Sequence, residues 1–282
     1  MSGEASRLAR AFEGRILLMD GAMGTMIQAR DLSAADFGGP SLEGCNEHLN
    51  LTRPDVIRAI HEAYLDAGAD LISPNCFGCA PYVLAEYGLT DHCYEITLAG
   101  ARLARAAADS RATPERPRFV LGAMGPGTRT ITVTGGVTFE GLQGTYYVQA
   151  QGLVEGGVDL LLVETSQDTR NIKAAVLAIQ KLSKEIGTRV PYVISVTIEP
   201  MGTMLAGQTV EAMWASLRHT HPLAFGMNCA TGPEFMTDHI RTLSSVTGEF
   251  VSCYPNAGLP DEEGKYLETP TSLASWGRSE AV

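Results

Sequence analysis

A repeated alternation of short apolar runs with longer helical stretches is the feature that most restricts how this chain can fold. Seven runs of five or six residues are almost wholly apolar. They cover residues 16–20, 70–75, 118–122, 159–164, 192–197, 224–228 and 250–254. Such runs, without polar alternation, are typical of strands buried on both faces of a parallel sheet. The intervening apolar spacing predicts helices over residues 54–67, 84–110, 139–156, 169–187, 210–219 and 233–247.

Alternating strands and helices leave two architectures open, a doubly wound open sheet and a (β/α)8 barrel. The segment Gly21-Ala22-Met23-Gly24 after the first run lacks the Gly-x-Gly-x-x-Gly spacing of a dinucleotide-binding fold. Polar residues instead end or follow the runs, at Asp20, Asn75, Glu164, Asn228 and Asn256. A ring of polar groups at the carboxyl ends of the strands is the arrangement of a TIM-type barrel.

The expected fold is therefore an α/β (β/α)8 TIM-type barrel, with residues 1–282 in a single domain. Seven runs are present rather than eight, and residues 256–282 contain no clear further strand. We expect the barrel to lack its eighth strand. Because a seven-stranded parallel barrel exposes backbone groups at its edges, we also expect a homo-oligomer or a protein of poor stability.

Composition narrows the class of protein and of partner. The 282 residues are 45% hydrophobic, enough for one large core. The net charge of −11, with no basic stripe, argues against a nucleic-acid partner. No apolar run approaches the roughly 18 residues of a membrane span, and the polar, helix-prone residues 1–15 do not resemble a secretion signal. We expect a cytoplasmic protein without membrane contact, whose six cysteines are thiols or metal ligands.

Two carboxylates stand where a substrate could be held. Asp20 precedes the small residues Gly21 and Ala22, whose backbone N–H groups could bind a carboxylate while Asp20 accepts from an ammonium group. Glu164 ends a run of four apolar residues, and a carboxylate there is costly unless it is paired or solvated. The other reading of Asp20 is a turn cap. The amides Asn75, Asn228 and Asn256 could orient a polar substrate or join loops to one another.

Four cysteines follow or lie in strands near the same predicted mouth. Cys229 comes directly after the sixth run, Cys76 and Cys79 form a Cys-x-x-Cys pair after the second, and Cys253 lies in the seventh. Zinc is held by about three or four such ligands. An unusual zinc site built from these thiols and a set of separate buried thiols both remain open.

Several motifs together resemble one family. They are Asp20-Gly21-Ala22-Met23-Gly24-Thr25-Met26-Ile27-Gln28, Cys45-Asn46-Glu47, Ala67-Gly68-Ala69-Asp70, Glu164-Thr165, Leu205-Ala206-Gly207-Gln208-Thr209, Gly226-Met227-Asn228-Cys229-Ala230 and Pro255-Asn256-Ala257-Gly258-Leu259-Pro260. In this order they resemble the homocysteine S-methyltransferase family, in particular the homocysteine-binding domain of cobalamin-dependent methionine synthase. The resemblance runs from about residue 10 to residue 265.

The resemblance implies a (β/α)8 barrel that binds homocysteine, or a similar small amino acid, at its C-terminal mouth. It implies that Asp20 and Glu164 bind the ammonium group, that backbone around Gly21–Gly24 receives the carboxylate, and that Cys229 is a zinc ligand. A free thiol titrates near 8.5, and zinc would hold the substrate sulfur as a thiolate. The methyl group would come from cobalamin carried by another protein or domain.

Two departures from the family accompany the resemblance. The family's other zinc ligands lie in a Gly-Gly-Cys-Cys motif on the eighth strand, and no such motif occurs here. The family usually has Asn-Thr-Phe where this chain has Asn75-Cys76-Phe77-Gly78-Cys79. The chain could be shortened, could borrow a strand from a partner, or could use Cys76, Cys79 or Cys253 instead. The functions left open are a homocysteine methyltransferase, a zinc-free corrinoid-linked methyltransferase for a non-thiol molecule, and a non-catalytic subunit.

Overall fold

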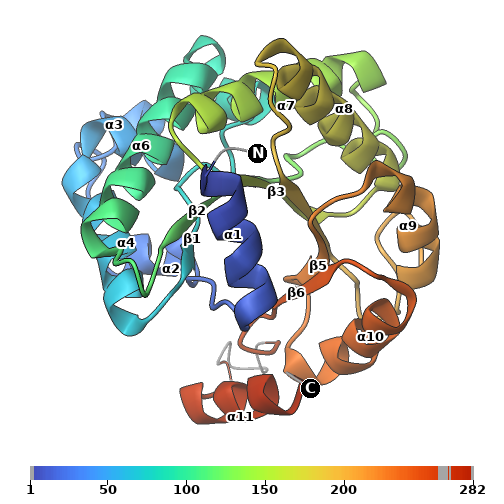
Figure 1. The fold of residues 1–282 in the computed structure, drawn as a ribbon. Coiled ribbons are helices and arrows are strands. Elements are labelled where there is room, and N and C mark those ends of the chain that lie inside the picture. The colour runs from blue at the N-terminus through green and yellow to red at the C-terminus, as the bar shows by residue number, and fades with distance from the viewer. Residues whose placement is uncertain (1–2, 260–265, 267, 281–282) are drawn as a thin grey trace.

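The chain forms one parallel sheet that curls into most of a barrel, with helices on the outside. A computed structural model describes residues 3–259, 266 and 268–280. Six strands pair in sequence order. They are β1 (Leu71–Ile72), β2 (Phe119–Met124), β3 (Leu160–Ser166), β4 (Tyr192–Val196), β5 (Ala224–Asn228) and β6 (Phe250–Tyr254). Figure 1 shows them as an arc around a common centre, and the expected α/β barrel architecture is confirmed.

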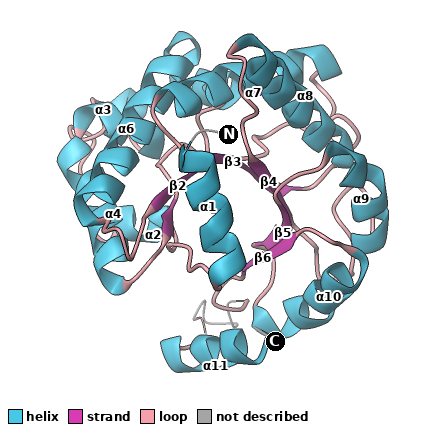
Figure 2. Cartoon of the chain, viewed as in Figure 1, coloured by secondary structure: helices cyan, strands magenta, loops and turns pink. Residues whose placement is uncertain are grey.

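Helices follow the strands and cover the outer face of this arc, as Figure 2 shows. The main outer helices are α4 (Pro54–Ala67), α6 (Cys93–Arg111), α7 (Phe139–Glu155), α8 (Thr169–Glu185), α9 (Val210–Leu217) and α10 (Pro233–Val246). Shorter helices in the loops are α2 (Met23–Gln28), α3 (Leu49–Thr52) and α5 (Pro81–Leu84). No helix among the described residues is long and apolar enough to cross a membrane.

The first two predicted strands are shorter than expected. Residues 16–20 contribute a single parallel bridge, between Met19 and Leu71, and β1 has two residues where residues 70–75 were predicted. The segment 16–20 has β1 as its only strand neighbour in the described chain. Pro74 lacks the N–H that a ladder needs, so it ends the pairing of β1 early.

Alternation along the strands separates an inner core from an outer one. Leu71, Phe119, Leu121, Leu160 and Leu162 pack together inside the barrel. Their neighbours Leu161 and Val163 belong to a second buried cluster with residues of α7 and α8. Because successive side chains of a strand point to opposite faces, Glu164 follows Leu160 and Leu162 toward the interior.

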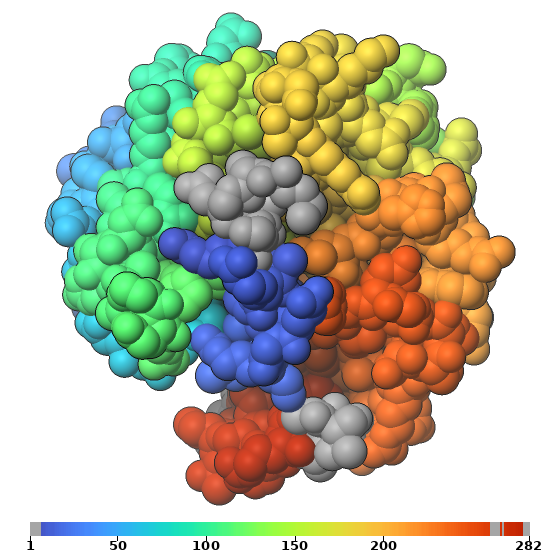
Figure 3. Space-filling view, in the orientation of Figure 1, coloured from blue at the N-terminus to red at the C-terminus, as the bar shows by residue number. Residues whose placement is uncertain are grey.

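The N-terminal helix α1 (Gly3–Gly14) closes one end of the barrel. Leu8 is buried among the inner-core residues, and the Phe12 ring lies 5.2 Å from that of Phe250 at the start of β6. Arg15, just after α1, makes two hydrogen bonds of 2.7 and 2.8 Å to the buried Asp70 carboxylate. The contacts with Phe250 and with Leu71 place α1 at the amino end of the strands, and Figure 3 shows it across the middle of that face of the molecule. Helix α1 does not cover the opposite, carboxyl end of the strands, where a functional site is expected in this fold.

The sheet has two free edges in the described part of the chain. Strand β6 pairs with β5 alone, and Phe250 and Val251 are 37% and 36% exposed, whereas every residue of β5 is buried. Ile16 and Leu18, beside the other edge, are 61% and 58% exposed. No eighth strand is found among residues 3–259, 266 and 268–280, as expected.

A final helix, α11 (Pro270–Glu280), was not expected from the sequence. It lies beside α10 (Figure 1), where the Trp276 indole N–H donates to Thr237 Oγ1 at 2.7 Å. Thr269 precedes it and its hydroxyl accepts from the Ser272 N–H at 3.1 Å, which is an N-cap.

Candidate active site

Asp20 is held at the carboxyl end of the barrel by the strand beside it. Its Oδ2 accepts from the Ser73 N–H at 2.7 Å. The next residue must be small, because a Cβ on Gly21 would lie 2.7 Å from the Tyr64 ring. The Tyr64 hydroxyl donates to the Ala22 carbonyl at 3.0 Å. Tyr64, on α4, therefore fixes the segment that carries Asp20 and leads into α2.

Glu164 enters the same space from β3. The pairing of β3 with β4 shifts register between Val163 and Ser166, and Thr165 has a φ of 53°. This left-handed residue is costly outside glycine and asparagine. Such irregularities concentrate at functional sites, where they aim a side chain.

The pKa values of both carboxyl groups are raised, and the charge of Asp20 contributes to the shift of Glu164. Burial raises the pKa of Asp20 to about 7, against hydrogen bonds from Ser73 that lower it. Burial, followed by the charge of Asp20, raises the pKa of Glu164 to about 8. Burial raises the pKa of Tyr254 as well, with further contributions from Asp20 and Glu164. The three side chains thus lie in one environment, which would favour a cation placed among them.

Cys229 lies near Glu164, and the Asn228 side chain holds it by a hydrogen bond. The Asn228 side chain donates to Cys229 Sγ at 3.2 Å and to Thr165 Oγ1 at 2.7 Å. Its Oδ1 accepts from the Thr165 N–H at 3.0 Å and from Ser195 Oγ at 2.6 Å. Burial raises the pKa of the Cys229 thiol, and the charge of Glu164 raises it further, while the hydrogen bonds from Asn228 and Thr165 lower it.

The backbone at Cys229 is also in an unusual conformation. Cys229 and Ala230 have φ values of 62° and 57°. The Cys229 N–H donates to the Tyr254 carbonyl at 3.2 Å, and the Thr231 N–H donates to the Cys229 carbonyl at 2.7 Å. These bonds hold a turn that L-residues rarely adopt, and the turn places the thiol beside β3 and β6.

The other two predicted asparagines have different surroundings. Asn75 is buried, and its side-chain nitrogen donates to the Asn46 carbonyl at 2.7 Å and to Asn50 Oδ1 at 3.2 Å. Both of its N–H donors therefore join loops to each other. Asn256 is exposed, and its backbone N–H donates to the Thr231 carbonyl. Asn228 is the predicted amide whose side chain directly contacts Cys229.

The structure does not bring the proposed substitute cysteines to Cys229. Cys76 and Cys79 are fully buried in the outer core, where Cys76 Sγ lies 3.6 Å from the Thr97 carbonyl of α6. Burial raises the pKa of the Cys79 thiol well above its usual range. Cys253 Sγ lies 3.6 Å from Met236 Sδ of α10, on the outer face of β6. Strand alternation explains this, because Tyr254 points inward and its neighbour Cys253 points outward.

These positions decide how well the residues fit a zinc ion. A catalytic zinc site needs three protein ligands, usually from cysteine, histidine and carboxylate side chains. Within the described residues, no group of three or more His, Cys, Asp or Glu side chains could hold a metal. Cys229 alone therefore does not make a zinc site with the rest of the described chain.

Sequence reasoning missed Tyr64, Thr165, Ser195 and Tyr254. Tyr254 could have been found by counting along its strand, since residues at every second position share a face. With Phe250 facing α1 at the amino end, Ser252 and Tyr254 must also face inward. Tyr64 gave no comparable signal, because its contact with Gly21 joins distant parts of the chain.

Comparison with known proteins identifies a family that this chain matches. The chain matches the family Homocysteine S-methyltransferase over residues 17–281. It is 43% identical over 256 residues to methionine synthases of Mycobacterium leprae (strain TN) and Mycobacterium tuberculosis (strain ATCC 25618 / H37Rv). Each match covers 91% of this chain and 21% of the relative, so the chain spans about a fifth of their length.

A solved structure has the same fold. The homocysteine methyltransferase MmuM from Escherichia coli, in its metallated form, superposes with a TM-score of 0.78 at 21% identity. The match covers 98% of this chain and 92% of that chain. At this identity the likeness establishes the barrel fold, whereas the family match covers nearly the whole sequence. The chain belongs to the homocysteine S-methyltransferase family.

Proposed function

We propose that the carboxyl end of the barrel binds homocysteine and presents its sulfur for methylation. The observation that carries the proposal is the shared environment of Asp20, Glu164 and Cys229. Two carboxyl groups with raised pKa values are poorly compensated in the free protein. An ammonium group between them would compensate both, which favours an amino acid as the ligand.

The remaining ends of the amino acid have matching surroundings. Its carboxylate would accept from the backbone N–H groups that follow Gly21 and Ala22. No side chain of the N-cap residue Ala22 occupies the first N–H groups of α2, so these donors are available. Its side chain would then extend toward Cys229. A thiol of ordinary pKa is a weak nucleophile near neutral pH, so the reaction requires that its proton be removed.

The metal and the methyl donor are further parts of the proposal. Zinc would supply a Lewis acid that holds the substrate sulfur as thiolate. The described residues offer Cys229 without the two further ligands that such an ion would need. The donor that we propose is a corrinoid carried by another protein or domain, supported by relatives named methionine synthase of which the matched segment covers only 21%.

Calorimetry with L-homocysteine, with and without added zinc, tests the binding step. We expect saturable binding that Glu164→Gln weakens by at least about tenfold, since one charge partner of the ammonium is lost. Glu234→Gln is the matched control, because Glu234 is an exposed carboxylate in the first turn of α10 at the same end of the barrel. No heat of binding in either condition would refute the proposal.

The second candidate is homocysteine binding without catalysis. The absence of a three-ligand group among the described residues favours it. Zinc analysis of the purified protein separates the two candidates, since about one zinc per chain supports a catalytic site. Binding of homocysteine without zinc and without methyl transfer supports the second.

A further inference from the structure

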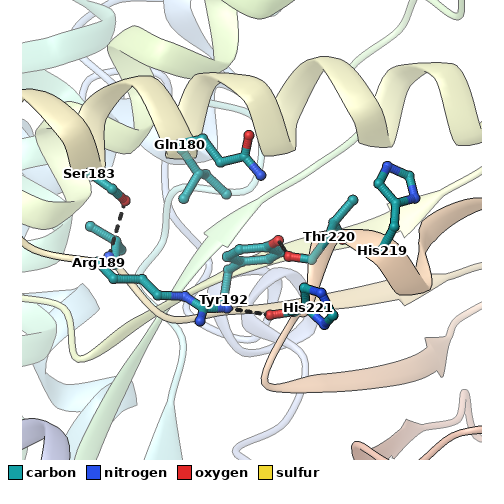
Figure 4. A pocket seen from close by; sticks show the side chains of 9 residues that line it. Gln180, Ser183, Arg189, Tyr192, His219, Thr220 and His221 are labelled. Carbon is teal, nitrogen blue, oxygen red and sulfur yellow. Dashed lines mark hydrogen bonds between the residues drawn. The ribbon is translucent and has the colours of Figure 1, made fainter.

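A second recess lies far from the carboxyl end of the barrel. A pocket of about 280 Å³ opens between the last turns of α8 and the short helix η5 (Arg218–Thr220). Its floor includes Tyr192, the first residue of β4, so it lies at the amino end of that strand. Figure 4 shows Gln180 reaching from α8 toward a wall formed by Arg189 and His221, with His219 at the other side.

The charge of this pocket is opposite to that of the molecule. The chain carries a net charge of −11, yet the lining contains Arg189, His219 and His221 and no aspartate or glutamate. Among the residues that the structure describes, no ion pair joins Arg189 to a carboxylate. A guanidinium with free N–H groups, with one imidazole beside it and another across the pocket, can attract and orient an oxyanion.

Two hydrogen bonds hold the wall in place without a ligand. Arg189 Nη2 donates to the His221 carbonyl at 2.5 Å. His221 is in the left-handed region, with φ 52° and ψ 58°, which turns its carbonyl toward Arg189. The Tyr192 hydroxyl donates to the Thr220 carbonyl at 2.5 Å and ties η5 to β4. A ligand would therefore meet donors already in place, which lowers the entropic cost of binding.

The remainder of the lining is less polar and limits the size of a ligand. Ile179 and Val190 are buried beneath the polar groups, and the Ser183 hydroxyl accepts from the Val190 N–H at 3.1 Å. The pocket volume is about 280 Å³. It suits a small organic body that carries one or two oxyanion groups.

We propose that this pocket is a binding site for a small molecule bearing a phosphate or carboxylate group. Arg189 holds the oxyanion, His219 and His221 donate to it, and Gln180 contacts the organic part from α8. The site is separate from the proposed homocysteine site, because β4 places Tyr192 at its amino end and Ser195, which supports Asn228, nearer its carboxyl end.

Calorimetry with inorganic phosphate, malonate and neutral glycerol tests the site. We expect saturable binding of at least one anion and none of glycerol, and the stronger of the two anions identifies the preferred group. Arg189→Gln is expected to weaken that binding by about tenfold or more. His221→Asn is expected to weaken it while keeping the turn, since asparagine tolerates the left-handed conformation. Arg170→Gln, at the opposite end of α8, is the matched control and is expected to bind as the wild type does.

A second measurement keeps the test independent of the variants. In the wild-type protein, phosphate or malonate is expected to slow amide hydrogen exchange in residues 183–192 and 218–221, with no change in homocysteine binding. Absence of saturable binding by both anions overturns the proposal. Equal binding by wild type and Arg189→Gln, or protection confined to other segments, overturns it as well.

Discussion

Two carboxyl groups at the carboxyl end of the barrel, Asp20 and Glu164, hold protons near pH 7 that the proposed ligand would displace. The pKa values of about 7 for Asp20 and about 8 for Glu164 keep more than one carboxyl proton bound near pH 7. An ammonium group favours the ionised forms, so binding it must release protons. The affinity for homocysteine should then rise with pH through this range, by at most about tenfold per pH unit for each proton released.

Calorimetry in two buffers of different ionisation enthalpy measures this release directly. We expect roughly one proton per homocysteine bound near pH 7, and fewer for Asp20→Asn. The Glu234→Gln protein provides the control. Identical heats in the two buffers would show that the carboxyl pair does not change protonation on binding.

The same pair makes the stability of the free protein depend on pH. Because the folded pKa values lie above the ordinary values near 4, the folded state binds more protons than the unfolded state between about pH 4 and pH 8. This contribution to stability is complete below about pH 4 and is lost as pH rises through 7 and 8. Denaturant unfolding should show a smaller pH-dependent loss in the variant with both Asp20→Asn and Glu164→Gln, whereas an unchanged slope would contradict the assignment.

Asn228 links the thiol to three strands, and its removal should act on the thiol itself. In Asn228→Ala the buried Ser195 hydroxyl and the Thr165 N–H lose their acceptor, which costs about 1–3 kcal/mol for each group left unsatisfied. The Cys229 thiolate also loses a donor, so its alkylation by iodoacetamide should need higher pH. Mass spectrometry can follow Cys229 against Cys253 as an internal control, and an unchanged pH profile would exclude this role.

At the scale of elements, α1 closes the barrel through Leu8. Leu8 is 4% exposed and belongs to a buried cluster with residues of five strands, including Leu71, Leu121 and Val193. Leu8→Ala should lower the free energy of unfolding by about 2–4 kcal/mol, because few neighbours can move into the space. Leu177→Ala on α8, where the side chain is 43% exposed, should cost under about 1 kcal/mol. Equal losses in urea unfolding would show that α1 is not part of the core.

The elements also show what the sequence could and could not predict. The strands were predictable because continuous apolar runs require burial on both faces, as in residues 192–197 and 224–228. Residues 16–20 read the same way, yet one bridge forms there, since pairing depends on a neighbour that local sequence does not reveal. Helix α11 could have been predicted from Thr269-Pro270, which is an N-cap followed by proline. The Ser- and Thr-rich composition of this segment made it look like a loop.

The candidate site, like the fold, could be predicted from the sequence only in part. Asp20, Glu164 and Cys229 could be predicted to lie near one another because each ends or follows a strand, and parallel strands bring their carboxyl ends together. Cys76 and Cys79 have similar positions in sequence but point into the outer core, which depends on how the loop turns toward α6. The direction of a loop side chain is set by tertiary packing and not by its distance from a strand.

At the scale of the whole molecule, the sheet edges differ in how well their hydrogen bonds are protected. Strands β4 and β5 have neighbours on both sides, whereas β6 and residues 16–19 have one each in the described chain. Amide exchange should therefore be fastest among the strands in residues 250–254 and 16–19, and slowest in β4 and β5, because edge pairs open locally before the sheet does. Repeating the measurement over a range of protein concentrations tests the proposed homo-oligomer, since a partner strand would protect β6 as concentration rises. Protection of β6 equal to that of β5 at every concentration would mean that the edge is covered within the chain itself.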